Sequence, residues 1–288
     1  MTVPAEVLPE LSPAQQERLT YRRGQARRSR LLAGSSTVVF LGVMSVVVVL
    51  SPGWDRVREQ FLDWEVAKDS FPSILEGFWL NLRVLAVCAV LIVCVGLAVA
   101  AMRTLRGPVF APLRFLAAFY TDVFRGFPLI IALYVIGFGV PGLRLQGVPT
   151  SPVVLGGAAL VLTYSAYVAE VFRAGIETVH PSQRMAARSL GLTYGQSMRR
   201  VVLPQAVRRV TPPLLNDFVA LQKDVGLISV LGAIDAVRAA QIEVARTYDF
   251  TPYLVAGLLF ILLAVPTVRL ADYVNLRAAR RQQAGGAL

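Results

Sequence analysis

Residues Arg184–Pro204 read RMAARSLGLTYGQSMRRVVLP, a polar, arginine-bearing interruption between long apolar segments. Gly191 stands where a left-handed cap would end one helix. Thr193 and Gln196 have the spacing of a capping box that begins a second helix, which we expect to end at Pro204. The stretch therefore predicts two short helices on a membrane surface, in a chain otherwise built to cross the membrane. Two such helices imply a partner on that surface.

The composition is that of an integral membrane protein. Hydrophobic residues make up 55% of the 288 residues and charged residues 16%, whereas a soluble domain is about half apolar and a quarter charged. A segment of roughly 20 apolar residues crosses about 30 Å of hydrocarbon. Six segments qualify, which predicts an all-α polytopic fold with about six transmembrane helices: residues 31–50, 73–101, 114–139, 153–174, 210–232 and 251–272.

The basic residues give an orientation. If residues 1–30 lie inside the cell, the inside segments hold 20 of the 29 basic residues, and the outside segments hold 6 basic and eight acidic residues. This is the pattern of the positive-inside rule, so both termini are expected in the cytosol. The net charge of +11 is then an orientation signal, and nucleic acid is not expected as a partner.

The chain divides into a few regions by composition. Residues 1–30 are expected to be a flexible, basic cytosolic tail. Residues 31–50 are expected to be a retained first span, because the apolar run is longer than a signal-peptide core. Residues 51–71 form an acidic outer loop, the transmembrane domain covers 71–277, and 278–288 are a polar cytosolic tail. Cys88 and Cys94 are i, i+6 on one helix and therefore face different ways, which excludes a disulfide between them.

No catalytic constellation is visible in the sequence, and we predict a transporter subunit that is not itself an enzyme and has no catalytic residue or metal site. The only histidine, His180, precedes Pro181 and is expected to cap a helix. A Walker A loop needs a lysine after glycine, but the only lysines, Lys68 and Lys223, follow Ala67 and Gln222. No cofactor is expected in this chain, and any ATP with its magnesium must be bound by another chain.

Charged residues inside the membrane segments are costly unless they are paired or face water. Glu170 and Arg173 are three apart on one helix face, so they form either a local ion pair or part of a polar substrate pathway. Lys223 and Asp224 are adjacent and point about 100° apart, so they need other partners or a water-filled cavity.

Two further polar groups have the same two interpretations. Asp122 and Arg125 in TDVFRGFPL are three apart and are expected to pair with each other, and Pro128 predicts a helix irregularity. Asn216, with its neighbour Asp217, is placed at the inner mouth of the pathway.

Tyr164 and Tyr167 lie one turn apart in LTYSAYVAEVF, together with small residues. Small residues favour close helix packing, which is the first interpretation. The second is a pair of aromatic rings that face the substrate.

These motifs together resemble a known family. Ala186-Ala187, three residues, Gly191, nine residues and Val201-x-Leu203-Pro204 resemble the E-A-A loop of ATP-binding-cassette importer permeases. YTDVFRGFPL, SAYVAEVFRAGI, LPQAVRRVTPPLLNDF and LQKDVGLISVLG are similar to the signatures of the polar amino acid permeases of that family. The resemblance covers about residues 71–277, and 31–50 is an addition to the five-span core of the subfamily.

The resemblance implies a fold, partners and site residues. The fold would be that of a type I ABC importer permease in a bacterial cell membrane. It would pair with a second copy or a related permease, with ATPase subunits and with an extracytoplasmic substrate-binding protein. The loop at 181–204 would contact the ATPase through Ala186, Ala187, Gly191, Leu203 and Pro204. The substrate pathway would contain Tyr164, Tyr167, Glu170, Asn216, Lys223 and Asp224.

Two residues depart from the family pattern. Met185 stands where a glutamate is usual, so any salt bridge of that glutamate is absent. Val225 stands where a small hydroxyl residue is common. The residues leave two other classes open, an ion-driven transporter or channel without an ATPase, and a membrane-anchored scaffold. Intramembrane charges of both signs fit acidic, basic or amide substrates equally well.

Overall fold

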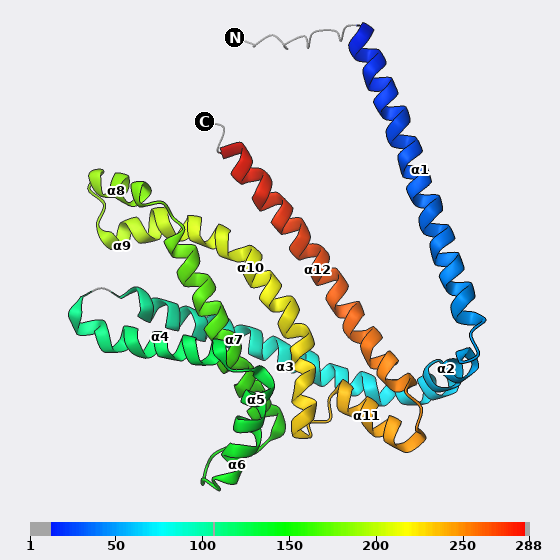
Figure 1. Cartoon of the computed structure of the whole chain (residues 1–288). Helices are drawn as coiled ribbons and strands as arrows, with labels where there is room; N and C mark the ends of the chain where they lie inside the picture. Colours follow the sequence, from blue (N-terminus) through cyan, green and yellow to red (C-terminus); the bar gives the residue numbers. More distant parts are fainter. Residues whose placement is uncertain (1–12, 106, 286–288) are drawn as a thin grey trace. The chain divides into compact units, whose positions relative to one another are not determined.

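The computed structural model describes residues 13–105 and 107–285, and every regular element in them is helical (Figure 1). The expected all-α fold is confirmed. The chain divides into two compact units, Met1–Glu59 and Gln60–Leu288. The α-helices are α1 (Pro13–Val49), α2 (Trp54–Phe61), α3 (Trp64–Thr104), α4 (Ala111–Gly126), α5 (Leu129–Tyr134), α6 (Val140–Gly142), α7 (Pro152–Glu177), α8 (Pro181–Ser189), α9 (Tyr194–Ser197), α10 (Leu203–Asp224), α11 (Ala236–Thr247) and α12 (Thr251–Gly285). Four shorter helical turns connect them, namely the 3-10 helices η1 (Pro108–Phe110) and η4 (Val225–Leu231) and the π-helices η2 (Val135–Gly139) and η3 (Met198–Val202).

Four helical segments are long and apolar enough to cross a membrane: Leu31–Val49, Trp54–Thr104, Pro152–Glu177 and Thr251–Arg277. Two bent pairs also qualify if each counts as one span, which raises the number to six. The first pair, Pro108–Gly126 with Leu129–Gly142, bends by 106°, and the second, Tyr194–Leu231 with Ala236–Thr247, bends by 52°.

The helices extend further than expected in three places. Residues 13–30 are helical and continuous with the first span, so the expected flexible tail is wrong for these residues, while 1–12 lie outside the described residues. The expected outer loop at 51–71 is largely helical, because Asp63 accepts hydrogen bonds from the N–H groups of Glu65 (2.9 Å) and Val66 (3.1 Å) and so begins α3 early. α12 continues to Gly285 through a run of good helix formers, in place of an irregular tail.

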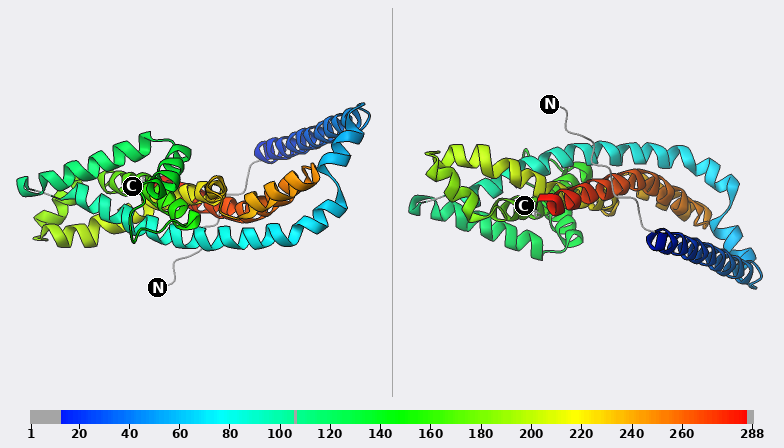
Figure 2. Two further views of the ribbon diagram at one scale, coloured as in Figure 1. Left: turned by 90° about the horizontal axis from the view of Figure 1, so that it is seen from below. Right: turned by 90° about the horizontal axis from the view of Figure 1, so that it is seen from above.

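The core of the Gln60–Leu288 unit lies where α3, α7, α10 and η4 meet. Buried apolar side chains from these four elements form one cluster that includes Leu85, Leu160, Leu221 and Ile228. A second cluster joins the N-terminal part of α3 to α11 and α12, and Figure 2 shows α11 lying along that part of α3. α7 is therefore held by α3, α4 and α10 over most of its length.

The expected irregularity near Pro128 is confirmed as a sharp break. Phe127 adopts an extended backbone, φ −93° and ψ 121°, because the following proline disfavours the helical conformation of the residue before it. The chain then turns by 106° into α5. Residues 125–128, at this break, line a pocket described below.

The helix expected to end at Pro204 continues instead to Asp224. The five residues of η3 have π-helical hydrogen bonds, and the N–H of Leu203 bonds to the carbonyl of Met198, five residues back. Pro204 comes directly after, where bonding returns to the i−4 pattern. Proline has no N–H to donate. Because the hydrogen-bond pattern changes at this position, the missing donor does not break the helix.

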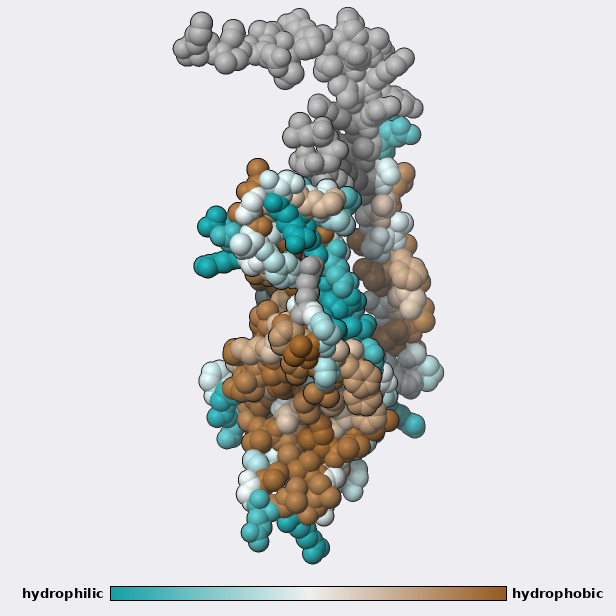
Figure 3. All heavy atoms as spheres, turned by 90° about the vertical axis from the view of Figure 1, so that its left-hand side faces the viewer, coloured by the Kyte–Doolittle hydropathy of each residue, from teal (hydrophilic) through white to brown (hydrophobic). Residues whose placement is uncertain are grey.

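Hydrophobic residues cover a broad zone on the face of the Gln60–Leu288 unit drawn in Figure 3, and hydrophilic residues gather at both of its ends. Figure 1 places α8 and α9 together beyond the C-terminal end of α7, and α6 near its other end. The apolar zone between polar ends is the arrangement that a bilayer requires.

Candidate functional site

The loop that carries α8 and α9 has the local structure predicted from its sequence. The ring Nδ1 of His180 accepts a hydrogen bond from the N–H of Ser182 (3.3 Å) and caps α8. Gly191 has φ +78°, which confirms the left-handed cap. Thr193 and Gln196 form both hydrogen bonds of the capping box. The two short helices α8 and α9 are thus fixed by their own caps.

The two alanines of this loop face opposite ways. Ala187 is buried against the rest of the chain, whereas Ala186 is exposed. Met185 (61% exposed) and Leu190 (82% exposed) lie on the open side with Ala186. The loop therefore presents apolar side chains outward from an otherwise basic segment.

Arginine side chains fasten the loop to the end of α7. Arg184 donates from Nη2 to the carbonyl oxygen of Ile176 (2.5 Å), and Arg209 of α10 donates to the carbonyl of Thr178. The last carbonyls of a helix have no partner within the helix, so these two bonds satisfy them. Arg184 therefore links α8, and Arg209 links α10, directly to the C-terminal end of α7.

α7 also carries one wall of a pocket of about 460 Å³, within the range of small-molecule sites. We call it the tyrosine pocket. Its lining residues come from the break after α4, from α7 and from α10: Arg125, Gly126, Phe127, Pro128, Leu129, Thr163, Tyr164, Tyr167, Asp217, Ala220 and Asp224.

Each of the two tyrosines donates a hydrogen bond to another residue that lines this pocket. Tyr164 donates its hydroxyl to Oδ2 of Asp224 (2.7 Å), and Tyr167 donates to the carbonyl oxygen of Arg125 (3.1 Å). The guanidinium carbon of Arg125 lies 6.0 Å from the centre of the Tyr167 ring. The rings of Tyr164 and Tyr167 are 6.3 Å apart. The interpretation of these residues as packing elements alone does not explain the two polar bonds.

Two polar atoms of lining residues are buried without a hydrogen-bond partner, Oγ1 of Thr163 and Oδ2 of Asp217. Thr163 is only 3% exposed. Buried polar atoms in folded proteins are nearly always satisfied. Thr163 and Asp217 thus bring to this pocket two polar atoms that no described residue satisfies.

Glu170 sits in a cluster of arginines beside this pocket. Its carboxylate lies 2.7 Å from Arg103 of α3, 2.5 Å from Arg173 and 4.0 Å from Arg125. Arg173 also pairs with Glu177. The expected pairing of Asp122 with Arg125 is wrong within the described residues, because Arg125 points to Glu170 while Asp122 is exposed.

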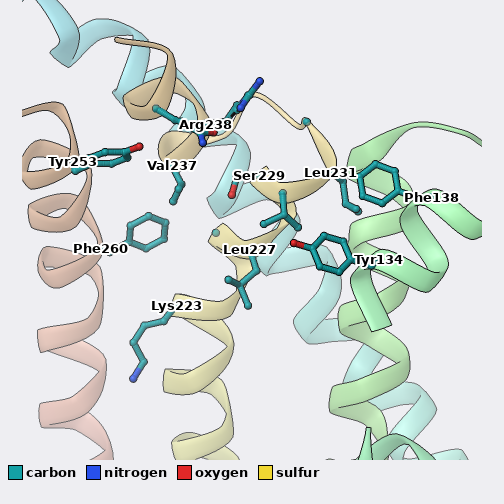
Figure 4. Close-up of a pocket in the computed structure, with 14 residues that line it drawn as sticks. Tyr134, Phe138, Lys223, Leu227, Ser229, Leu231, Val237, Arg238, Tyr253 and Phe260 are labelled. Atoms are coloured by element: carbon teal, nitrogen blue, oxygen red, sulfur yellow. Dashed lines mark hydrogen bonds between the residues drawn. The ribbon is translucent and has the colours of Figure 1, made fainter. Parts of the chain in front are cut away.

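Lys223 and Asn216, the remaining candidate residues, do not line the tyrosine pocket. Lys223 lines a second pocket of about 870 Å³ together with Tyr134, Phe138, Arg238, Tyr253 and Phe260 (Figure 4). This aromatic pocket is lined from a different side of α10 than the tyrosine pocket, which agrees with the expected divergence of Lys223 and Asp224. Asn216 is exposed and lines neither pocket.

Sequence reasoning missed residues whose partners are distant in the chain. No local sequence signal marks Arg103 as a partner of Glu170, which lies 67 positions away. Asn81 was also missed, although it donates to Asp235 (2.9 Å) and accepts from the N–H of Ala236 (3.0 Å), which fixes α11 on α3. A lone asparagine within an apolar segment is the one available signal for such a bond.

Comparison with known proteins agrees with this architecture. Residues 92–280 match the family described as binding-protein-dependent transport system inner membrane component. The arginine transport system permease protein ArtQ of Bacillus subtilis (strain 168) is 34% identical over 71% of this chain and 91% of its own length. The probable glutamine ABC transporter permease protein GlnM of the same strain is 35% identical over 73% of this chain and 94% of its own.

A solved structure is similar as well. The crystal structure of an amino acid ABC transporter with histidines aligns with a TM-score of 0.68 at 32% identity, over 75% of this chain and 98% of the other. The expected fold, an all-α ABC importer permease, is confirmed. From its helices, its loop and these matches, the chain belongs to the family of binding-protein-dependent transport system inner membrane components.

Proposed function

We propose that this chain is the permease subunit of an ATP-driven importer of amino acids, in which the 181–204 loop couples a separate ATPase to the tyrosine pocket. Similar proteins named for arginine and glutamine transport support the substrate class. The observation that carries the proposal is the direct connection from loop to pocket. Arg184 of α8 holds the end of α7, and α7 carries Tyr164 and Tyr167.

The loop supplies the docking surface for the ATPase. Its exposed apolar residues, Met185 and Leu190, are suited to burial in a groove of a partner. ATP and magnesium are bound by that partner, because this chain has no Walker A loop. The distribution of arginines supports a cytosolic position for the loop and both termini in a bacterial cell.

Transport follows from two arrangements of the same helices. Closure of the ATPase pair moves α8, and Arg184 and Arg209 pass this displacement to α7 as a rigid body. The tyrosine pocket then opens to one side of the membrane or the other. A second permease copy or a related permease completes the assembly, and an extracytoplasmic binding protein delivers the amino acid.

Uptake of radiolabelled amino acids tests the proposal, in cells that express the chain and in cells from which its gene is deleted. We expect uptake of at least one amino acid to require the chain, and an ATP-binding subunit to co-purify with it. Uptake that continues after ATP depletion and follows an ion gradient would contradict the proposal.

A further inference from the structure

The first half of α1 is basic and the second half is apolar. Residues 13–30 contain six arginines and one acidic residue, Glu17, whereas Leu31–Val49 contains no charged residue. α1 runs through both parts as one helix. Its backbone therefore sets the distance of each arginine from the start of the apolar span. The six arginines are Arg18, Arg22, Arg23, Arg27, Arg28 and Arg30.

Three of these arginines fall at the depth of lipid headgroups. The span Leu31–Val49 has 19 residues, which is about 29 Å of helix and matches the roughly 30 Å of a hydrocarbon core. Arg27, Arg28 and Arg30 come within four residues of this span, so they lie within roughly 6 Å of it along the helix axis. The headgroup region on each side of a bilayer is about 5–8 Å thick. These three arginines are therefore at the level of the lipid phosphates.

The basic positions surround the helix and do not form a single stripe. At about 100° per residue, positions 22, 23, 27, 28 and 30 are spread over more than half of the helix circumference. The side chain of Arg28 is exposed, and so is every residue of the apolar span. Lipid therefore has access to this helix from every side. A protein that covered one face would leave some of the arginines unpaired.

The opposite end of the span has no such excess of positive charge. α2 contains Arg56 and Arg58 together with Asp55 and Glu59, so its charges cancel. An anionic group is attracted to the first end of the span and not to the second.

We propose that residues 22–30 of α1 bind anionic phospholipids, whose phosphates pair with the arginines around the helix. A guanidinium group binds phosphate oxygens through two parallel N–H donors. Clusters of four to eight basic residues beside a membrane span attract anionic lipid. The proposal goes beyond the proposed function, because it does not depend on what the chain transports.

Electron paramagnetic resonance of spin-labelled lipids tests the proposal on the full-length chain in phosphatidylcholine nanodiscs. The probes are phosphatidylglycerol and phosphatidylcholine that carry the same nitroxide on the acyl chain. We expect the wild type to favour phosphatidylglycerol by at least about threefold in association constant, because each arginine near the surface adds to the attraction. The double variant Arg28→Gln with Arg30→Gln should lower this preference at least about twofold.

The matched control removes two arginines of the same helix that lie further from the bilayer. Arg18 and Arg22 are roughly 20 Å and 13 Å from the span along the helix axis, beyond the Debye length of about 10 Å at 0.1 M salt. Arg18→Gln with Arg22→Gln should therefore leave the preference nearly unchanged. Nanodiscs expose both faces of the bilayer, so an inverted chain offers the same site. A melting temperature close to that of the wild type shows that each variant is folded.

Competition with salts identifies the source of the phosphate. Sodium chloride should weaken the preference for phosphatidylglycerol, because salt screens exposed charges. Sodium phosphate at the same ionic strength should weaken it no further. A clearly larger effect of phosphate would show that the arginines bind soluble anions, and would overturn the assignment to lipid.

Two other results would also overturn the proposal. One is a wild-type chain that associates equally with both lipids. The other is an equal loss of preference in the two double variants, which would show that net charge alone decides and that headgroup contact does not. Neither result bears on amino acid import, which is measured separately by uptake.

Discussion

The α8–α9 loop and the tyrosine pocket are organised in opposite ways. The loop is fixed by neighbours in sequence, since His180, Gly191, Thr193 and Gln196 each act within a few residues. The pocket is formed by three segments more than 30 positions apart, held together by bonds such as Tyr164–Asp224. The caps of the loop therefore depend on residues close in sequence, whereas the pocket forms only when α4, α7 and α10 are in place.

The largest effect on uptake is expected for Gly191→Val in the loop. Gly191 has φ +78°, a conformation that costs a β-branched residue roughly 1–2 kcal/mol or more. We expect ATP-dependent uptake to be lost while the chain still inserts in the membrane. The control is Gly195→Val, because Gly195 lies in α9 without a positive φ and with open space at its Cβ. Normal uptake by the Gly191 variant would contradict the docking role of the loop.

The region of the pocket should instead be destabilised by the loss of a contact between residues that are distant in the chain. Glu170→Gln leaves Arg103, Arg173 and Arg125 close together without the carboxylate that joins them. We expect the unfolding free energy to fall by roughly 1.5–3 kcal/mol, the range for hydrogen bonds to charged groups. Thermal unfolding in detergent measures this.

Glu177→Gln is the matched control for that measurement. Glu177 is 59% exposed and, among the described residues, pairs only with Arg173, so we expect a change below about 1 kcal/mol. Equal effects of the two variants would show that the cluster is an ordinary surface network.

Arg184→Gln tests the connection between the two regions. It removes the bond to the carbonyl of Ile176 without changing the capping box or the pocket lining. We expect a several-fold fall in uptake with ATPase binding retained, because the loop would still dock but would no longer move α7. Arg208→Gln, at an exposed position of α10, should leave uptake near the wild-type level. Loss of ATPase binding in the Arg184 variant would place this arginine in the docking surface instead.

The smallest effect on uptake is expected for Tyr164→Phe. The change removes the hydroxyl that orients Asp224 and keeps the ring in the core. A hydrogen bond to a charged group contributes about 1.5–3 kcal/mol at most, so substrate affinity should fall by about tenfold and uptake should persist. Unchanged affinity would indicate that Asp224 does not contact the substrate.

The sequence predicted the parts whose signals are local. The helical class, the capping box of Thr193 and Gln196, the left-handed Gly191 and the break before Pro128 all follow from residues within one or two turns. The continuation past Pro204 was not predicted, because a π-helical turn that absorbs a proline has no clear sequence pattern.

The candidate site was predicted only in part. Tyr164, Tyr167 and Asp224 do share one pocket. Lys223 and Asn216 do not line it, since adjacent residues on a helix face different ways and only the packing decides which way is inward. The role of Arg103 depends on a contact across 67 positions, which no local pattern encodes.

We propose that the loop binds an ATPase and passes its motion to the pocket. A photo-activated cross-linker at position 190, where Leu190 is 82% exposed, tests this in intact membranes. We predict that mass spectrometry will identify a subunit carrying a Walker A loop as the captured protein, and that the same cross-linker at Leu143, which is 67% exposed, will not capture it. Capture of no ATP-binding subunit at position 190, in membranes that perform ATP-dependent uptake, would contradict the account.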